Sequence, residues 1–275
     1  MYTEVQCHQG KPPDFPRRKL REIDAFPIGE SSDAFRERHF PDCSQDQWND
    51  WIWQLRHSFK SAEALSPILA LTADETEAIQ AENHRLPLRI TPYYASLCLN
   101  PDPQDPLRRT VIPTTAEWAR NPAESLDPLA EDSHSPVPGL VHRYPDRALF
   151  LVSEQCACYC RYCTRSRRVG VKRGIAMGKA VWEKAVSYIE ATPSIRDVII
   201  SGGDPLMLPD DAIVWLLAQI CRIPHVEMVR IGTKIPVVLP QRITHALVAK
   251  LKPFKPLYVS LHVTHPSAAG QGRVF

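Results

Sequence analysis

Short apolar runs alternate with amphipathic segments through the second half of the chain. The apolar runs cover residues 148–154, 197–203, 226–233 and 256–263, and the helical patterns cover 177–193, 210–223 and 241–252. In the first helical pattern, Val181, Ala185 and Ile189 recur at the spacing of one helix face. Nearly continuous apolar strands separated by amphipathic helices are typical of a parallel sheet with right-handed crossovers. The pattern predicts an α/β core of four strands and three helices, either a barrel or a doubly wound sheet.

The first half of the chain has a different pattern. It holds most of the 26 prolines and predicts helices joined by irregular segments. Three helix starts have the spacing of a capping box: Ser44 with Gln47, Thr72 with Glu75, and Thr114 with Glu117. After the first of them an apolar stripe predicts a helix that packs on the core: Trp48, Ile52, Leu55 and Phe59. We therefore divide the chain into a mainly helical region, 1–147, and an α/β core, 148–275.

Composition and charge exclude several function classes. A chain of 275 residues with 44 % hydrophobic content can bury a sizeable core. The formal charge of +2 gives no sign of a nucleic-acid partner. The sequence has neither an apolar run long enough to span a membrane nor a secretory signal at its start. We therefore expect a cytoplasmic protein without a membrane or nucleic-acid partner.

Four of the eight cysteines lie within residues 156–163. In a long chain without an export signal, such crowding favours metal binding over disulfides. Cys156, Cys160 and Cys163 have the spacing C-x3-C-x2-C, which lets three thiolates from one loop meet one metal centre. Three ligands would leave one iron of a [4Fe–4S] cluster open, whereas Cys158 could complete a four-cysteine zinc site. The scattered cysteines are interpreted as reduced thiols: Cys7, Cys43, Cys98 and Cys221.

Polar residues follow each of the predicted strands. The cysteine loop follows the first strand, Ser201-Gly202-Gly203-Asp204 the second, Thr233 and Lys234 the third, and His262 and His265 end the fourth. In parallel α/β folds the carboxyl ends of the strands share one edge, which carries the chemistry. We expect these residues to share one site.

The cysteine spacing at the end of a first parallel strand resembles the radical S-adenosylmethionine (SAM) superfamily. That resemblance implies a partial (β/α) barrel, a [4Fe–4S] cluster on the three cysteines, and SAM bound at the open iron, where its cleavage gives a 5′-deoxyadenosyl radical. Tyr159 matches an aromatic residue near the adenine. Ser201, Gly202, Gly203 and Asp204 match the glycine-rich motif, in which glycines let backbone approach the ligand and the aspartate accepts from the methionine ammonium.

Longer stretches resemble lysine 2,3-aminomutase and its relatives, namely 127–168, 200–208, 229–244 and WNDWIWQLRHSF near residue 50. This resemblance runs from about residue 15 to 266 and implies exchange of an α-amino group with a β-hydrogen, most simply on L-lysine, with pyridoxal phosphate. It implies that Arg143, Tyr144 and Arg147 lie in the pyridoxal-phosphate region. It also implies that Arg165 meets the substrate carboxylate and that His262 lies near SAM. The nearby arginines, Arg161, Arg167 and Arg168, are interpreted as structural or surface residues.

Two departures from this family stand out. Tyr162 occupies the position where the lysine enzymes carry histidine. The chain also lacks a lysine in the sequence context of the family's Schiff-base lysine, since that context surrounds none of Lys172, Lys179, Lys234 and Lys250. The ending SAAGQGRVF no longer resembles the family, which predicts an incomplete barrel with an exposed last strand and poor solubility. Two alternative substrates stay open, glutamate and a lysine residue of a protein. A non-catalytic protein that binds the cluster or SAM is the third alternative. We also expect an electron donor such as a flavodoxin or ferredoxin, and a homo-oligomer.

Overall fold

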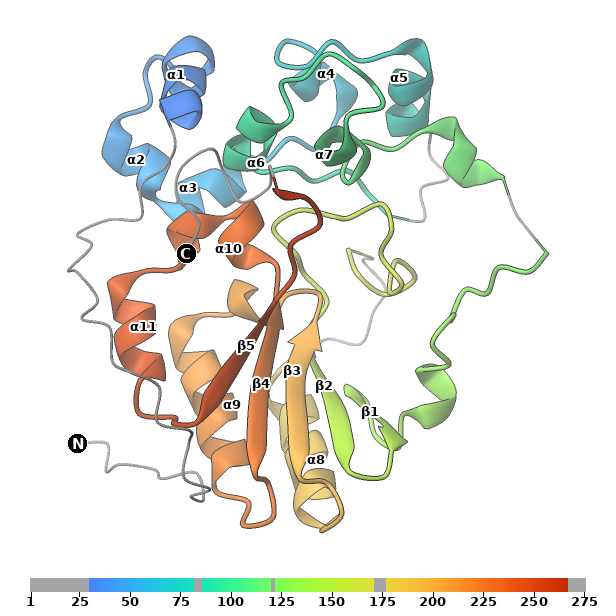
Figure 1. Cartoon of the computed structure of the whole chain (residues 1–275), viewed down its shortest axis with the longest axis vertical. Coiled ribbons are helices and arrows are strands. Elements are labelled where there is room, and N and C mark those ends of the chain that lie inside the picture. Colours follow the sequence, from blue (N-terminus) through green and yellow to red (C-terminus); the bar gives the residue numbers. More distant parts are fainter. Residues whose placement is uncertain (1–29, 82–85, 120–121, 171–176, 267–275) are drawn as a thin grey trace.

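The fold is known from a computed structural model that describes residues 30–81, 86–119, 122–170 and 177–266. Cys7, Lys172 and the ending 267–275 lie outside the described residues. Within them, one sheet has five strands in the order β1-β2-β3-β4-β5 (Figure 1). The strands are β1 (Leu140–Tyr144), β2 (Arg147–Ser153), β3 (Asp197–Gly202), β4 (Met228–Thr233) and β5 (Leu257–Leu261).

The four predicted strands are confirmed as β2 to β5, and they are mutually parallel. The sequence prediction omitted β1, which pairs antiparallel with β2 and closes a hairpin where Tyr144 faces Arg147. This strand precedes the proposed boundary at residue 147. Its pattern is half exposed, so it lacks the continuous apolar run that identified its neighbours.

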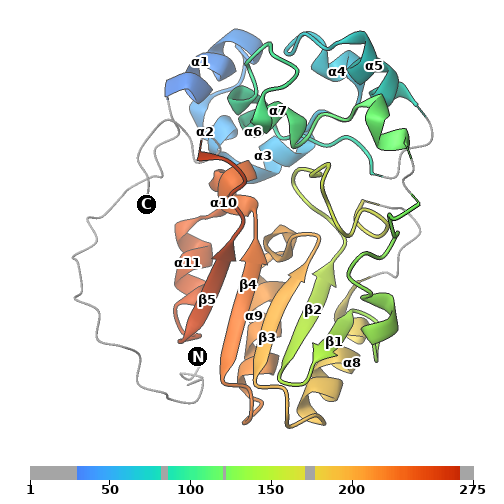
Figure 2. The same ribbon diagram turned by 45° about the vertical axis from the view of Figure 1, so that its right-hand side comes forward.

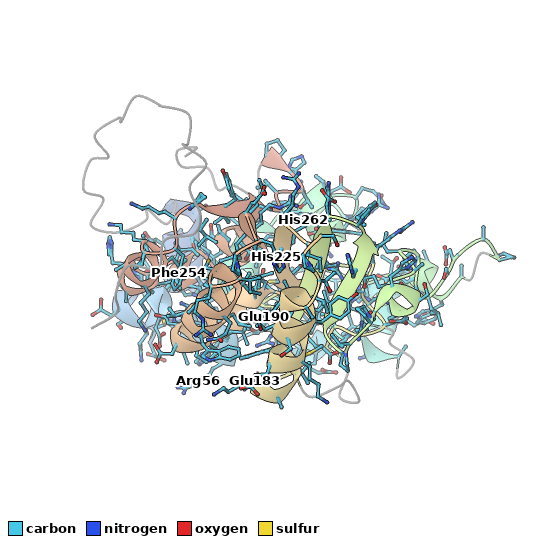
Figure 3. The ribbon with its side chains drawn as sticks, turned by 90° about the horizontal axis from the view of Figure 1, so that it is seen from below. Arg56, Glu183, Glu190, His225, Phe254 and His262 are labelled. Carbon is cyan, nitrogen blue, oxygen red and sulfur yellow. The ribbon has the colours of Figure 1, made fainter. Side chains whose placement is uncertain are left out.

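The three predicted crossover helices cover one face of the sheet. They are α8 (Lys179–Glu190), α9 (Asp210–Cys221) and α11 (His245–Leu251), and Figure 2 shows them behind the strands. In Figure 3, Glu183 and Glu190 of α8 lie on one side of the strands and His262 on the other. Sequential parallel strands with helices on one face form a singly wound sheet, so the partial (β/α) barrel is confirmed and the doubly wound alternative is wrong.

Short helices of the first half lie beyond the carboxyl ends of the strands (Figures 1 and 2). They are α1 (Glu30–His39), α2 (Gln45–Asn49), α3 (Trp51–Arg56), α4 (Ala62–Leu65), α5 (Ala73–Gln80), α6 (Pro92–Leu97) and α7 (Pro106–Arg109). The hydroxyl of Thr91 joins the two regions, because it caps α6 and donates to the carbonyl of Val238 (2.7 Å) in α10 (Ile235–Val238). One apolar core runs from these helices into the sheet.

Two of the three predicted capping boxes form, at Ser44 and at Thr72. The third prediction is wrong: Thr114 begins only a 3-10 helix (Thr115–Trp118), and neither hydrogen bond of the box forms between these described residues. Glu117 instead accepts two hydrogen bonds from Arg161 (2.9 and 2.6 Å), which removes its carboxylate from the cap.

The apolar stripe after Ser44 belongs to two helices, where one was predicted. Asp50 is extended and its carboxylate caps α3 by accepting from the backbone N–H of Ile52 (2.9 Å). Trp48 and Phe59 are buried as expected, although Phe59 lies beyond α3 and pairs with Ile90.

None of the helices in the described ranges combines the length and the apolar character needed to cross a bilayer.

Candidate functional site

The carboxyl ends of the parallel strands surround a cavity of about 620 Å³, a volume in the usual range for small-molecule sites. The cysteine loop after β2, the Ser201–Asp204 turn after β3, Thr233 and Lys234 after β4, and residues 260–263 at the end of β5 all line it. The expected gathering of the strand-end residues is confirmed except for His265, which is not among the residues that line the cavity.

Cys156, Cys160 and Cys163 line this cavity from one loop. Burial raises the pKa of the Cys156 and Cys163 thiols, so iron would have to displace their protons. Within the described residues, no three histidine, cysteine or acidic side chains are close enough together to hold a single metal ion. In a cluster each thiolate binds its own iron, so the three thiols that line the cavity could each serve a separate iron.

Cys158 has a different environment from the other three loop cysteines. Its side chain is only 3 % exposed, and its sulfur accepts a hydrogen bond from the backbone N–H of Thr91 (3.4 Å). Burial raises the pKa of Cys158 to about 11. This thiol therefore packs against the start of α6, and the contact gives no support to the four-cysteine zinc site.

The two glycines after β3 are required by the neighbouring loop. A Cβ on Gly202, whose φ is +132°, would lie 2.3 Å from the carbonyl oxygen of Ser153, and one on Gly203 would lie 2.4 Å from that of Gln155. Both glycines thus let β3 approach the backbone that leads into the cysteine loop. The sequence interpretation gave a different reason, close approach to a ligand, for the same two residues.

Asp204 is engaged by groups of the protein itself. Its carboxylate accepts from the backbone N–H groups of Leu206 (3.0 Å) and Lys234 (2.8 Å) and from the hydroxyl of Thr233 (2.7 and 2.9 Å). Burial raises its pKa to about 6. The aspartate of the glycine-rich motif therefore fixes the end of β4 beside the cysteine loop, while Ser201 lines the cavity next to it.

Lys234 and Tyr162 form a contact that sequence reasoning missed. The Lys234 ammonium donates to the sulfur of Cys160 (3.3 Å) and to the hydroxyl of Tyr162 (2.7 Å). The Tyr162 ring stacks on His262, with centroids 5.8 Å apart. Burial, followed by the nearby Lys234 charge, lowers the pKa of His262. Position at a strand end was the only sequence signal for Lys234.

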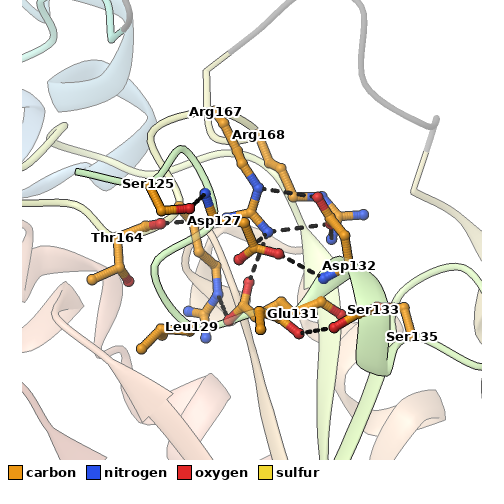
Figure 4. A network of polar contacts seen from close by, with 12 residues as sticks. Ser125, Asp127, Leu129, Glu131, Asp132, Ser133, Ser135, Thr164, Arg167 and Arg168 are labelled. Atoms are coloured by element: carbon orange, nitrogen blue, oxygen red, sulfur yellow. Dashed lines mark hydrogen bonds and ion pairs between the residues drawn. The ribbon is translucent and has the colours of Figure 1, made fainter. Parts of the chain in front are cut away.

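Arg165 lines the cavity, as expected for a group that meets a substrate anion. Its Nε donates to Glu131 (2.8 Å), a residue that is only 2 % exposed. The neighbouring arginines are held by acidic residues: Figure 4 shows Arg167 and Arg168 beside Asp127, Glu131 and Asp132. Together with the Arg161–Glu117 pair, these contacts support the structural interpretation of the other arginines.

Tyr159 also lines the cavity, although most of its ring is buried against Leu86 and Val169. Arg143, Tyr144 and Arg147 lie elsewhere, in the hairpin at the amino end of β2. Tyr144 is 56 % exposed between the two guanidinium groups. Arg143 donates to the carbonyl of Leu129, and Arg147 pairs with Asp146. The structure therefore does not bring this trio together with the cysteine loop.

Comparison with known proteins shows the family of the chain. Residues 150–271 match the Radical SAM superfamily model. The chain is 46 % identical to L-lysine 2,3-aminomutase of Clostridium subterminale over 228 residues, which is 83 % of this chain and 55 % of that protein. It is 46 % identical to the Bacillus subtilis (strain 168) enzyme of the same name, over 80 % of this chain and 47 % of that protein. It is 39 % identical to glutamate 2,3-aminomutase of Clostridioides difficile (strain 630), over 81 % of this chain and 52 % of that protein.

The chain thus spans about half the length of the curated relatives it matches. That half contains the three-cysteine loop, the glycine-rich turn and the strand ends that enclose the cavity. The chain belongs to the lysine 2,3-aminomutase family of the radical SAM superfamily.

Proposed function

We propose that Cys156, Cys160 and Cys163 hold the [4Fe–4S] cluster that the radical SAM family implies, and that SAM binds in the adjoining cavity. The observation that carries this proposal is the convergence of the three thiols and the Ser201–Asp204 turn on one cavity. When bound, the cluster and SAM would supply a 5′-deoxyadenosyl radical.

The side chains of this loop would orient the bound molecules. Glu131 fixes the Nε of Arg165, which leaves the other guanidinium nitrogens to pair with a substrate carboxylate. Tyr159 and the stacked pair of Tyr162 and His262 provide ring surfaces at the cavity wall. Tyr159 and the cysteine loop form the buried side of this wall, whereas Tyr162 and the end of β5 are exposed to solvent.

The activity proposed for the whole protein is transfer of an amino group from the α to the β carbon of an amino acid, with L-lysine converted to β-lysine. The identity to lysine 2,3-aminomutases supports lysine. The identity to a glutamate 2,3-aminomutase makes glutamate the second candidate. Both candidates present the same α-carboxylate to Arg165, so this half of the protein does not separate them.

Pyridoxal phosphate is a further proposal, supported by the resemblance to lysine 2,3-aminomutases. The hairpin of Arg143 and Arg147 gives this proposal no support by itself, because it is exposed and Arg147 is already paired with Asp146. We therefore assign no step to this cofactor. The electron donor, the homo-oligomer and the cytoplasmic location stay predictions.

Anaerobic reconstitution tests the proposal. We expect about four irons and four sulfides per chain. This content should be retained in Cys158→Ala and lost in Cys160→Ala. Cys158 is the matched control, because it lies in the same loop but packs against Thr91. The loaded protein should release 5′-deoxyadenosine from SAM when reduced with dithionite. Equal iron loss in both variants, or a zinc-loaded protein without iron, would contradict the cluster assignment.

Substrate is tested on the same loaded protein with SAM, pyridoxal phosphate and dithionite. β-Lysine from lysine supports the aminomutase proposal, whereas β-glutamate from glutamate would select the second candidate. SAM cleavage with neither product would reject both candidate substrates for this polypeptide. A loaded cluster that releases no 5′-deoxyadenosine would mark it as a non-catalytic cluster-binding protein.

A further inference from the structure

We propose that Lys234 donates a charge-assisted hydrogen bond to the Cys160 ligand and thereby raises the reduction potential of the cluster. This inference rests on the proposed function, because it requires a cluster on the cysteine loop. It adds a role for the residue that directly follows β4 and lies outside both the cysteine loop and the glycine-rich turn.

The Lys234 ammonium is buried and points at sulfur. The residue is 9 % exposed, and its Nζ lies 3.3 Å from the Cys160 sulfur and 2.7 Å from the Tyr162 hydroxyl. The rings of Tyr94 and Tyr162 lie 5.8 and 5.2 Å from the same nitrogen. The cation therefore has one sulfur, one hydroxyl and two aromatic faces around it.

Within the part of the chain that the structure describes, no carboxylate forms an ion pair with this cation. Among the described residues, none of the ion pairs includes Lys234. The hydrogen bond that Asp204 accepts from Lys234 comes from the backbone N–H of Lys234, not from its ammonium. A buried cation without a counter-charge is costly, so a neighbouring anion is expected. The thiolate of Cys160 bound to iron is the anion within reach.

The backbone fixes the position of this cation before any iron binds. Asp204 holds the Lys234 N–H and the Thr233 hydroxyl at the end of β4. Tyr162, which lies between two cluster ligands in sequence, holds the far end of the side chain. Both ends of Lys234 are thus tied to the glycine-rich turn and the cysteine loop.

Electrostatics sets the direction of the effect. Reduction transfers one electron from a low-potential donor to the cluster without a proton, so the site gains one negative charge. A fixed ammonium beside a ligand sulfur favours the more negative state, and hydrogen bonds to sulfur and net charge are among the factors that set cluster potentials. Removing the Lys234 charge should make the cluster harder to reduce.

The test is the cluster midpoint potential, measured by titration with electron paramagnetic resonance detection on anaerobically reconstituted protein at equal iron content. Lys234→Met should lower the potential, with at least a tenfold fall in the reduced-to-oxidised ratio at a fixed donor potential, which is about 59 mV for one electron. Lys234→Arg keeps the charge and should stay near the wild-type potential. Tyr162→Phe keeps the lysine but removes the hydroxyl that accepts from its ammonium. It should lower the potential by less than Lys234→Met does.

A wild-type potential in Lys234→Met would overturn the inference, as would an equal shift in Lys234→Arg and Lys234→Met. Weaker SAM binding at an unchanged potential would assign Lys234 to SAM and also overturn it. If neither Lys234→Met nor Lys234→Gln assembles a cluster while Lys234→Arg does, the cation serves assembly and the tuning role is wrong. Wild-type protein without a cluster signal would instead refute the proposed function.

Discussion

At the residue scale, the buried ion pair of Glu75 and Arg108 links the α5 cap to α7. Arg108 is fully buried and donates through Nε (2.8 Å) and Nη2 (2.6 Å) to Glu75, whose Oε2 also accepts from the backbone of Thr72 (2.8 Å). Burial opposes ionisation of this carboxyl, but the hydrogen bonds from Arg108 and Thr72 outweigh it and lower its pKa. The pair therefore requires an ionised Glu75.

Glu75→Gln should lower the free energy of unfolding at pH 7 by about 3–5 kcal/mol, because it leaves the Arg108 charge buried without its partner. Because the native pKa lies below its usual value of about 4.5, the stabilisation is present above that pH and is lost as pH falls through the native pKa. Denaturant titrations at pH 7 and pH 4 measure the gap. The exposed Glu77→Gln on the same helix is the control and should change stability by less than about 0.5 kcal/mol; a pH-independent gap would contradict the prediction.

Gly202 provides a second test at the residue scale. Gly202→Ala should cost at least about 2 kcal/mol of folding free energy, because a Cβ at φ +132° would overlap the Ser153 carbonyl at 2.3 Å. It should also reduce iron loading, since the overlap displaces the start of the cysteine loop. Thermal unfolding and iron content measure both effects. Gly178→Ala is the matched control, because a Cβ there meets nothing within 4 Å; equal effects of the two substitutions would refute the steric explanation.

At the element scale, helix α8 is fixed on the sheet by one indole. Trp182 is buried, and its Nε1 donates to the carbonyl of Val152 in β2 (3.1 Å). Ala185 and Ile189 continue the same buried face. This hydrogen bond sets the position of the first crossover helix directly behind the strand that leads into the cysteine loop.

Trp182→Phe should lower the free energy of unfolding by about 1–3 kcal/mol more than Trp215→Phe, because it leaves a buried carbonyl without this donor. Trp215 is the control, since its ring lies 6.1 Å from that of Trp182 but is only partly buried. Urea denaturation followed by circular dichroism gives both values. Equal destabilisation by the two substitutions would mean that ring volume, and not the hydrogen bond, positions α8.

At the scale of the whole molecule, strand β5 forms an exposed edge of the sheet. Strand β5 pairs with β4, and within the described ranges no further strand lies beyond it. Its apolar side chains are open to solvent, with Val259 56 % exposed. The predicted exposed last strand is confirmed, and such an edge favours association between chains.

The 275-residue polypeptide should therefore self-associate, and Val259→Lys should weaken that association about tenfold, since burying such a side chain is worth about 1.5 kcal/mol. Light scattering over a concentration series measures it. Val248→Lys on α11 removes a similarly exposed apolar group away from the edge and should leave association unchanged. A monodisperse monomer at high concentration would contradict the prediction.

The sequence by itself determined the succession of strands and helices along the α/β core, two helix caps, and the three-cysteine spacing, whereas the order of the strands within the sheet came from the structure. These features depend on periodicity or on groups a few residues apart, so local pattern is sufficient to read them. It also identified Gly202 and Gly203. The sequence interpretation explained them by close approach to a ligand, whereas the structure explains them by close approach to the backbone of Ser153 and Gln155.

Only the tertiary structure decided the partners of isolated polar residues. Glu117 meets Arg161 across 44 positions of sequence, and Lys234 meets Cys160 across 74. No local pattern encodes such contacts, since each depends on the fold that brings two distant segments together. Strand β1 is a different case, because it pairs with the next strand along the chain and escaped prediction through its half-exposed pattern. The physical reason is that caps and hydrophobic periodicity act between near neighbours in sequence, whereas long-range ion pairs and cavity walls act between near neighbours in space.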